Sequence, residues 1–208
     1  MSYKSAFERM GNTIINTFKI PGISLILIVL FAVLIAYLVV RRRNSLTNTV
    51  DIMSMIPYII PGSVVGIAFG ITFRNKFFSI GGLALMVIAL IVRRLPYTIR
   101  SSVAVLQQIP LSIEEASISL GASKLKTFFK ITVPMMAGGI ISGAILSWVT
   151  LISELSTAII LYTTKTKTLT ISIYTEVLRG NYGIAAALST VLTVLTVISL
   201  LVIMINAV

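Results

Sequence analysis

Residues 20–43, IPGISLILIVLFAVLIAYLVVRRR, decide the fold class of this chain. The run from Ile20 to Val40 carries no charge, and about 20 apolar residues are enough to cross a bilayer as a helix. Arginines 41–43 follow directly, and Lys and Arg concentrate on the cytoplasmic side of membrane proteins. The stretch therefore predicts a transmembrane helix that ends in the cytoplasm. It is too long for a signal peptide, and no small-residue cleavage site follows it.

The composition of the whole chain agrees with this first stretch. Of its 208 residues 57% are hydrophobic and 11% are charged, whereas a soluble domain has about 45–50% apolar and about 25% charged residues. The mean hydropathy is +1.03, which excludes both a soluble globule and a disordered chain. Histidine and cysteine are absent, so disulfides, thiolate or imidazole metal sites and Ser-His-Asp triads are excluded. The predicted fold class is an all-α integral membrane protein.

Further apolar runs predict about five transmembrane helices within a single domain, residues 1–208. The four runs after the first cover residues 52–73, 77–92, about 138–162 and about 183–208. Both ends of the chain suggest a fragment or one half of a longer protein. The polar segment 163–183 is expected to form an external loop or short helix.

The net charge of +11 is interpreted through topology and contact with anionic lipid, and no nucleic-acid partner is expected. A second basic segment, residues 92–134, follows the third predicted span. Its basic residues are Arg93, Arg94, Arg100, Lys124, Lys126 and Lys130. Two crossings separate it from arginines 41–43, so both basic segments are predicted to lie on the cytoplasmic side, with the N-terminus outside.

The segment 110–121, PLSIEEASISLG, predicts a short helix in this cytoplasmic stretch. Ser112 and Glu115 have the spacing of a capping box, and Gly121 suits the left-handed position after a helix. One face of the helix is expected to carry Ile113, Ala116, Ser117 and Leu120. A second helix is predicted over residues 124–133, before Pro134. Such a helix fits a groove in another protein, and a solvated amphipathic loop at the membrane surface is the alternative.

The residues of this segment resemble the EAA loop of bacterial ABC importer permeases. That pattern reads E-A-A, three residues, G, nine residues, I-x-L-P. Here it is matched by Glu115, Ala116, Ser117, Gly121, Ile131 and Pro134, with Ser117 in place of the second alanine and Val133 in place of leucine. In that family the loop is the coupling helix that docks into the ATP-binding subunit, so these six residues are expected to couple the chain to an ATPase.

The resemblance covers nearly the whole chain and implies the fold and partners of that family. Segments 57–70, 95–100, 106–110, 154–158 and 168–171 are similar to the ferric iron subgroup. Relatives for thiamine, polyamines, sulfate or phosphonates share parts of them. The resemblance implies a type I-like transmembrane domain in the bacterial inner membrane. Its expected partners are a cytoplasmic ATP-binding subunit dimer, an extracytoplasmic substrate-binding protein and a second transmembrane domain in a homodimer, a heterodimer or a fused chain.

The chain is not expected to be an enzyme or to hold a cofactor. It has no G-x-x-x-x-G-K-[ST] phosphate loop, so ATP hydrolysis falls to a partner. An ion-coupled secondary transporter is a rival, but it predicts several intramembrane acids and inverted repeats. A structural membrane protein is a second rival, and it has no need for the 115–134 pattern.

Three residues are candidates for the translocation pathway. Glu154 is the only acid in an apolar predicted span and lies about 24 Å along its helix from Gly138. It either lines an entry for a cation, including Fe(III), or forms a structural ion pair or solvated contact near Lys165 and Lys167. Pro57 and Pro61 are expected to bend the second span, giving a mobile element near the path. Gly62 begins a double G-x-x-x-G, and residues 139–143 form another, both typical of close helix packing.

Overall fold

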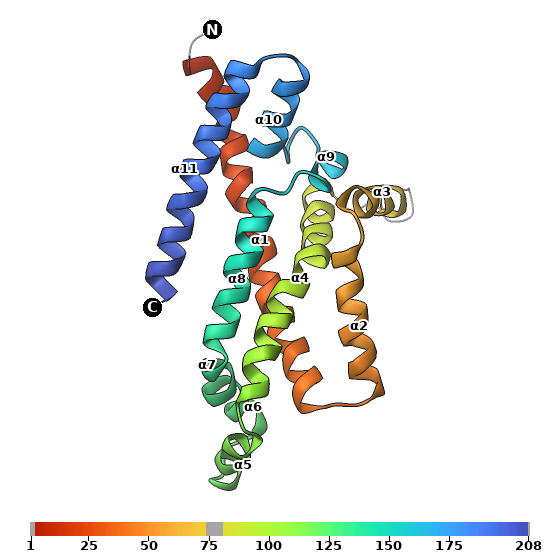
Figure 1. Ribbon diagram of the computed structural model, residues 1–208, viewed down its shortest axis with the longest axis vertical. Helices are drawn as coiled ribbons and strands as arrows, with labels where there is room; N and C mark the ends of the chain where they lie inside the picture. The colour runs from red at the N-terminus through yellow and green to blue at the C-terminus, as the bar shows by residue number, and fades with distance from the viewer. Residues whose placement is uncertain (1–2, 74–80, 208) are drawn as a thin grey trace. The chain divides into compact units, whose positions relative to one another are not determined.

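The computed structural model describes the backbone of residues 3–73 and 81–207 and the side chains of residues 11–73 and 81–205. These parts of the chain are built from helices joined by short turns (Figure 1). In order the helices are α1 Tyr3–Arg41, α2 Ser45–Ile59, α3 Gly62–Phe73, α4 Gly82–Gln108, α5 Leu111–Ser119, α6 Lys124–Thr127, the π-helical turn η1 Phe128–Thr132, α7 Val133–Met135, α8 Ala137–Ile152, α9 Ala158–Leu161, α10 Leu169–Leu178 and α11 Tyr182–Ala207.

Between three and five membrane spans fit these helices. Three continuous segments are long and apolar enough to cross a bilayer: Gly11–Arg41, Gly82–Gln108 and Tyr182–Ile205. Two bent pairs, α2 with α3 and the helices of 124–135 with α8, raise the count to five if each pair is one span. The predicted all-α membrane fold is confirmed. The start of the third predicted span, residues 77–80, and Val208 lie outside the described residues.

The third predicted span ends too early at residue 92. Helix α4 continues without a break to Gln108 and contains Pro96. Arg93, Arg94 and Arg100 therefore lie inside a candidate span rather than at the start of a cytoplasmic loop. The physical reason is compensation of charge: the Arg93 guanidinium meets an acid from a distant segment, so the helix continues past a buried charge.

The fourth predicted span is too long. Helix α8 ends at Ile152, and Glu154 lies in a turn before the short helix α9, not inside a helix. Its carboxylate accepts the backbone N–H of Thr157 at 3.1 Å. Side chains that bond to nearby backbone in this way compete with helical hydrogen bonding. The acid itself thus helps to end the helix that the hydropathy pattern extended to residue 162.

The predicted bend in the second span is confirmed at Pro61, whereas Pro57 lies inside helix α2. Helix α2 ends at Ile59 and α3 begins at Gly62. The Pro61 carbonyl accepts the N–H groups of Val64 and Val65 at 3.0 and 3.2 Å and so starts the new helix. Proline suits this place because the first turn of a helix does not use its missing N–H.

The chain divides into two compact units. Unit 1 comprises residues 1–25, 60–93 and 148–208, and unit 2 comprises residues 26–59 and 94–147. In unit 1 a small core forms around Leu85, Ala89 and Leu161. In unit 2 a larger core gathers parts of α1, α4 and the segment before α8. Its buried members are Ala32, Ala36, Ile99, Val103, Leu106, Ile109 and Met136.

Glycines bring α8 against α4 within unit 2, as the G-x-x-x-G spacing predicts. A Cβ on Gly143 would lie 2.6 Å from the Cα of Thr98, and one on Gly139 would lie 2.7 Å from the Ser101 carbonyl oxygen. Next to this contact the hydroxyls of Thr98 and Ser147 lie 3.0 Å apart. The two helices therefore touch through their backbones, with a buried polar link beside the contact.

Candidate coupling site and buried ion pairs

Helix α5 starts differently from the prediction. It begins at Leu111 after Pro110, which has φ −61° and ψ 139°, and no side chain caps it. Ser112 therefore lies within the first turn, and the capping box with Glu115 does not form. Because proline fixes φ near the value that a helix needs, the chain enters the helix directly after Pro110 and does not use the serine hydroxyl.

The end of α5 follows the prediction. Gly121 has φ +88°, its N–H donates to the Ile118 carbonyl at 2.9 Å, and the Ala122 N–H donates to the Ser117 carbonyl at 3.1 Å. This pair of bonds is the Schellman motif, which favours glycine at the left-handed position. Ser123 then caps α6, with its Oγ accepting the N–H of Lys126 at 3.3 Å. Pro134 lies inside α7, where its missing N–H is tolerated.

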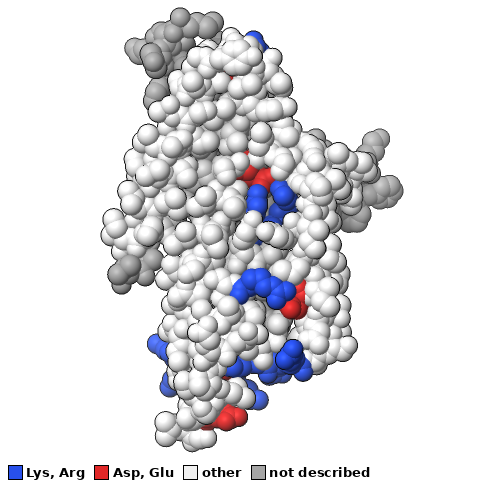
Figure 2. Space-filling model, viewed as in Figure 1, with Lys and Arg blue, Asp and Glu red and all other residues white. Residues whose placement is uncertain are grey.

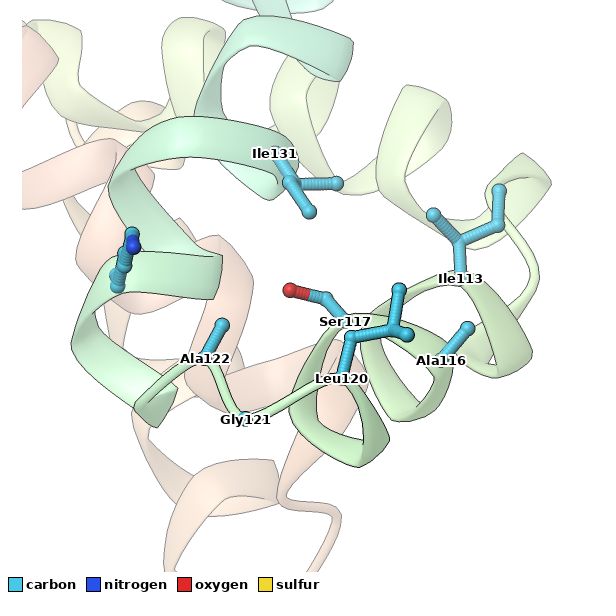
Figure 3. A pocket seen from close by; sticks show the side chains of 8 residues that line it. Ile113, Ala116, Ser117, Leu120, Gly121, Ala122 and Ile131 are labelled. Carbon is cyan, nitrogen blue, oxygen red and sulfur yellow. The ribbon is translucent and has the colours of Figure 1, made fainter.

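A hollow of about 400 Å³ opens beside α5 (Figure 3). The four residues predicted to share a face of the helix all line it, and Ile131 closes it from the π-helical turn. The complete lining is Ile113, Ala116, Ser117, Leu120, Gly121, Ala122, Lys126 and Ile131. Four of the six EAA-pattern residues are thus brought together here. Glu115 is exposed outside the lining, and Pro134 lies outside it in α7.

The opposite side of α5 carries a contact that sequence reasoning missed. Glu114 is 4% exposed, and its Oε1 lies 2.7 Å from Nε of Arg41 at the end of α1. The Tyr37 hydroxyl donates to its Oε2 at 3.2 Å. No sequence signal separates Glu114 from the exposed Glu115 beside it. The contact joins the arginine end of α1 directly to α5 within unit 2, which agrees with the prediction that both lie on one side of the membrane.

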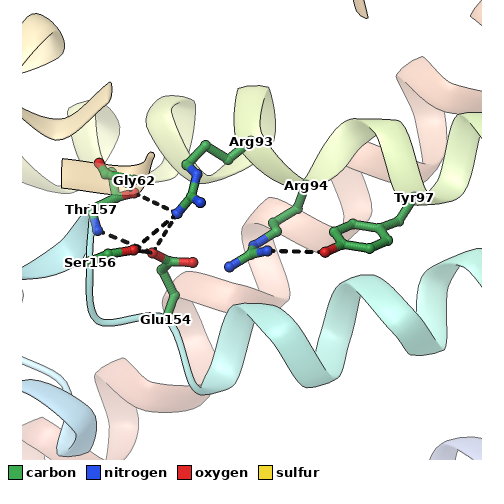
Figure 4. A network of polar contacts seen from close by, with 7 residues as sticks. All are labelled: Gly62, Arg93, Arg94, Tyr97, Glu154, Ser156 and Thr157. Carbon is green, nitrogen blue, oxygen red and sulfur yellow. Dashed lines mark hydrogen bonds and ion pairs between the residues drawn. The ribbon is translucent and has the colours of Figure 1, made fainter. Parts of the chain in front are cut away.

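Glu154 belongs to a buried network in unit 1 (Figure 4). Its Oε1 accepts Arg93 Nη1 at 2.7 Å and the Ser156 hydroxyl at 2.7 Å. The side chains of Arg93 and Glu154 are 13% and 2% exposed. Of the two interpretations left open for Glu154, the geometry has the form of an ion pair, and its partner is Arg93 rather than Lys165 or Lys167.

Gly62 is part of the same network. The Thr157 hydroxyl donates to the Gly62 carbonyl at 3.1 Å. A Cβ on Gly62 would overlap the Arg93 guanidinium and the Ser156 hydroxyl. Two of the three candidate pathway residues, Glu154 and Gly62, are therefore brought together, and Pro61 directly precedes Gly62 in the chain. Among the described residues no group of three or more Asp, Glu, His or Cys side chains gathers as a metal site.

The segment predicted as an external loop or short helix contains α10. Its C-terminal turn is held by Glu176, which accepts the Asn181 amide and an Arg179 guanidinium N–H, both at 2.8 Å. The Asn181 hydrogen bond and then the Arg179 charge lower the pKa of Glu176 below its ordinary value, against the effect of burial. In Figure 2 the viewed face is largely uncharged, with its Lys, Arg, Asp and Glu side chains gathered in a few patches.

Comparison with known proteins decides the family. A sequence profile described as "Binding-protein-dependent transport system inner membrane component" matches residues 7–208. The chain belongs to this family.

Relatives within the family carry different substrates in their names. The chain is 33% identical over 181 residues to the ferric transport system permease protein FbpB of Actinobacillus pleuropneumoniae, a match covering 86% of this chain and 26% of that protein. It is 32% identical over 182 residues to the molybdate/tungstate transport system permease protein WtpB of Pyrococcus abyssi, covering 86% and 69%. The chain spans about a quarter of the length of its ferric relative.

Solved structures agree with the fold. The alginate ABC importer of bacteria is matched with a TM-score of 0.79 at 19% identity, covering 96% of this chain and 79% of that chain. The MetNI methionine ABC transporter is matched with a TM-score of 0.75 at 21% identity, covering 100% and 96%. The described helices of this family member thus have the arrangement of an ABC importer transmembrane domain.

Proposed function

We propose that this chain is the transmembrane permease subunit of a bacterial ABC importer and forms the path for ferric iron across the inner membrane. An extracytoplasmic binding protein delivers the iron, and a pair of cytoplasmic ATP-binding subunits hydrolyses ATP. The observation that carries the proposal is α5, a largely exposed helix that is followed by Gly121 with φ +88° and borders the hollow formed with Ile131.

The surface around α5 suits docking of a partner protein. Leu120 is 90% exposed and Leu125 is 72% exposed, and apolar groups displayed in this way mark interaction sites. Glu115 adds an exposed carboxylate beside them. When ATP closes the two ATP-binding subunits, their motion displaces α5 and switches the path from inward-facing to outward-facing. After hydrolysis the substrate is released inside. A second transmembrane domain, from an identical chain, a different chain or a fused half, completes the path.

Ferric iron is supported by the relative from Actinobacillus pleuropneumoniae. A second candidate class is a tetrahedral oxyanion, which the molybdate/tungstate relative favours because this chain covers 69% of it.

We also propose that Glu154, Pro61 and Gly62 lie along the path. Because Arg93 neutralises Glu154, a cation that used this carboxylate would have to displace the guanidinium. Proline and glycine at this place let the α2–α3 junction change its bend during transport.

Reconstitution tests the proposal directly. The complete importer, with its ATP-binding subunits, is placed in liposomes and supplied with binding protein loaded with Fe(III), molybdate or sulfate. We expect ATP-dependent uptake of iron alone. Uptake of molybdate alone would show that the substrate is the oxyanion and not iron. Failure of the chain to copurify with any ATP-binding subunit would overturn the importer assignment.

A further inference from the structure

Adjacent acids at the start of α5 face opposite environments. Glu115 is exposed, whereas Glu114 is 4% exposed and bonded to α1. An acid is very rarely buried without a partner, because removing its charge from water costs several kcal/mol. Glu114 therefore has a role inside the protein, separate from the docking surface on the other side of the helix.

Arg41, in α1, forms hydrogen bonds to the chain on both sides of the turn that leads into α5. Its Nε bonds to Glu114 at 2.7 Å, and its Nη2 donates to the Ile109 carbonyl at 2.8 Å. Ile109 immediately precedes Pro110, at which α5 starts. One guanidinium thus holds the α4–α5 turn and the first turn of α5 with separate, charge-assisted hydrogen bonds, which are the stronger kind.

Tyr37 adds a contact on the far side of the loop. Its hydroxyl donates to Glu114 at 3.2 Å, while its ring packs edge-on against Phe128 with 4.9 Å between ring centroids. Phe128 opens the π-helical turn after α6. The last turns of α1 therefore contact the chain both before and after the Gly121 turn.

The covalent route from α5 to the next span is less direct. It runs through α6, the π-helical turn and α7, and then through a bend of 65° before α8. π-helical turns interrupt regular α-helical hydrogen bonding and occur frequently at functional sites. On its other face α5 borders an open hollow. A displacement of α5 therefore acts on α1 through the charged contacts of Arg41, whereas the side-chain hydrogen bond between α5 and α6 joins two neutral hydroxyls, Ser117 and Thr127, at 2.9 Å.

We propose that Glu114, Arg41 and Tyr37 form a clamp that transmits the displacement of α5 to α1. The three are positioning residues for the transport step, and the inference rests on the proposed function of the chain as an importer permease. In each cycle the clamp makes α1 follow the coupling helix, so that the motion of the ATP-binding subunits reaches this span without first passing through α8.

The test compares uptake with ATP hydrolysis in the complete reconstituted importer, supplied with its loaded binding protein. We expect Glu114→Gln to lower the amount taken up per ATP hydrolysed about tenfold, within the range typical of coupling residues. Copurification of the ATP-binding subunits and basal hydrolysis should stay at the wild-type level. The charge-exchanged protein, Glu114→Arg with Arg41→Glu, should recover part of the uptake. Tyr37→Phe, which keeps the ring and loses one hydrogen bond, should show a smaller loss.

A matched control is available in the same unit. Asp51 pairs with Arg100 at 3.2 Å, but their side chains are 24% and 48% exposed, so Asp51→Asn should leave the ratio unchanged. If Glu114→Gln or Tyr37→Phe keeps the wild-type ratio, or if charge exchange restores protein level without restoring uptake, the clamp is refuted. A wild-type complex without ATP-dependent uptake would instead refute the proposed function.

Discussion

Removal of Arg93 is expected to destabilise unit 1 by leaving a buried acid behind. In Arg93→Met the methionine keeps much of the apolar contact of the arginine stem, while Glu154 loses the cation 2.7 Å from its Oε1. The Glu154 side chain is 2% exposed, so water cannot replace that cation. Breaking a buried ion pair on one side costs about 3–5 kcal/mol.

The other hydrogen bonds of Glu154 place the expected loss of unfolding free energy near the lower limit of this range. Glu154 keeps hydrogen bonds from the Ser156 hydroxyl and the Thr157 N–H, so we expect about 3 kcal/mol for Arg93→Met. At about 2–4 °C per kcal/mol for a protein of this size, the melting temperature should fall by about 6–12 °C. Glu154→Gln keeps an acceptor for the same donors, and we expect a smaller loss of about 2 kcal/mol.

The double variant provides the decisive comparison. With Arg93→Met and Glu154→Gln together both members of the pair lose their charge, so the protein should be more stable than Arg93→Met alone. The coupling between the two changes should reach about 1–3 kcal/mol. Thermal unfolding in detergent can be followed by the fluorescence of Trp148, the single tryptophan, which is buried in unit 1 and bonded to Ser199 at 3.0 Å.

Uptake measured below each melting temperature separates structure from transport. Loss of uptake in Glu154→Gln with an unchanged melting temperature would favour a pathway role for this acid. The ion-pair reasoning is refuted if all three proteins melt within about 2 °C of the wild type, or if the losses of the single variants simply add.

Three further predictions concern packing, the coupling turn and topology. Gly143→Ala should lower the free energy of unfolding by about 1–3 kcal/mol, because its Cβ would meet Thr98 of α4. Gly138→Ala, whose Cβ would have nothing within 4 Å, should melt like the wild type. Equal melting temperatures for the two variants would contradict the close contact. Gly121→Val places a β-branched residue at φ +88°, so it should lower the free energy of unfolding by about 1–3 kcal/mol and reduce ATP-driven uptake. Normal uptake would show that transport does not require this turn. Cysteine at the exposed Ser123 should react in intact cells only with membrane-permeant reagents and cysteine at the exposed Thr164 with impermeant ones; the opposite labelling would invert the topology.

The apolar spans could be predicted because hydropathy is a local property of the sequence. The first predicted span, residues 20–40, lies within α1, although this helix begins earlier, at Tyr3, and the last predicted span agrees with α11 within a few residues. The Gly121 turn was predictable for the same reason, since a φ of +88° favours glycine at that one position. Each of these features is set by neighbours in the chain.

The incorrect boundaries depend on partners that are distant in sequence. Arg93 and Glu154 are 61 positions apart, and each alone suggests an end to a membrane span or an open functional site. Together they form a neutral pair that α4 can carry in its interior and that helps to end α8. Likewise, Glu114 and Glu115 are the same residue type at adjacent positions, and only their tertiary contacts distinguish a buried clamp from an exposed surface.

The same contacts change the basis of the predicted topology. The basic segment 92–134 was predicted to lie on the cytoplasmic side, but its Arg93, Arg94 and Arg100 lie within a candidate span and not in a loop. Arg41 still indicates which side of the membrane holds α5, because its guanidinium contacts Glu114 and the Ile109 carbonyl. That contact fixes the end of α1 beside α5 whatever the charge count, and Lys124 and Lys126 follow α5 within one short helix. Basic residues at this end of unit 2 therefore support a cytoplasmic position for α5 through geometry together with the positive-inside rule.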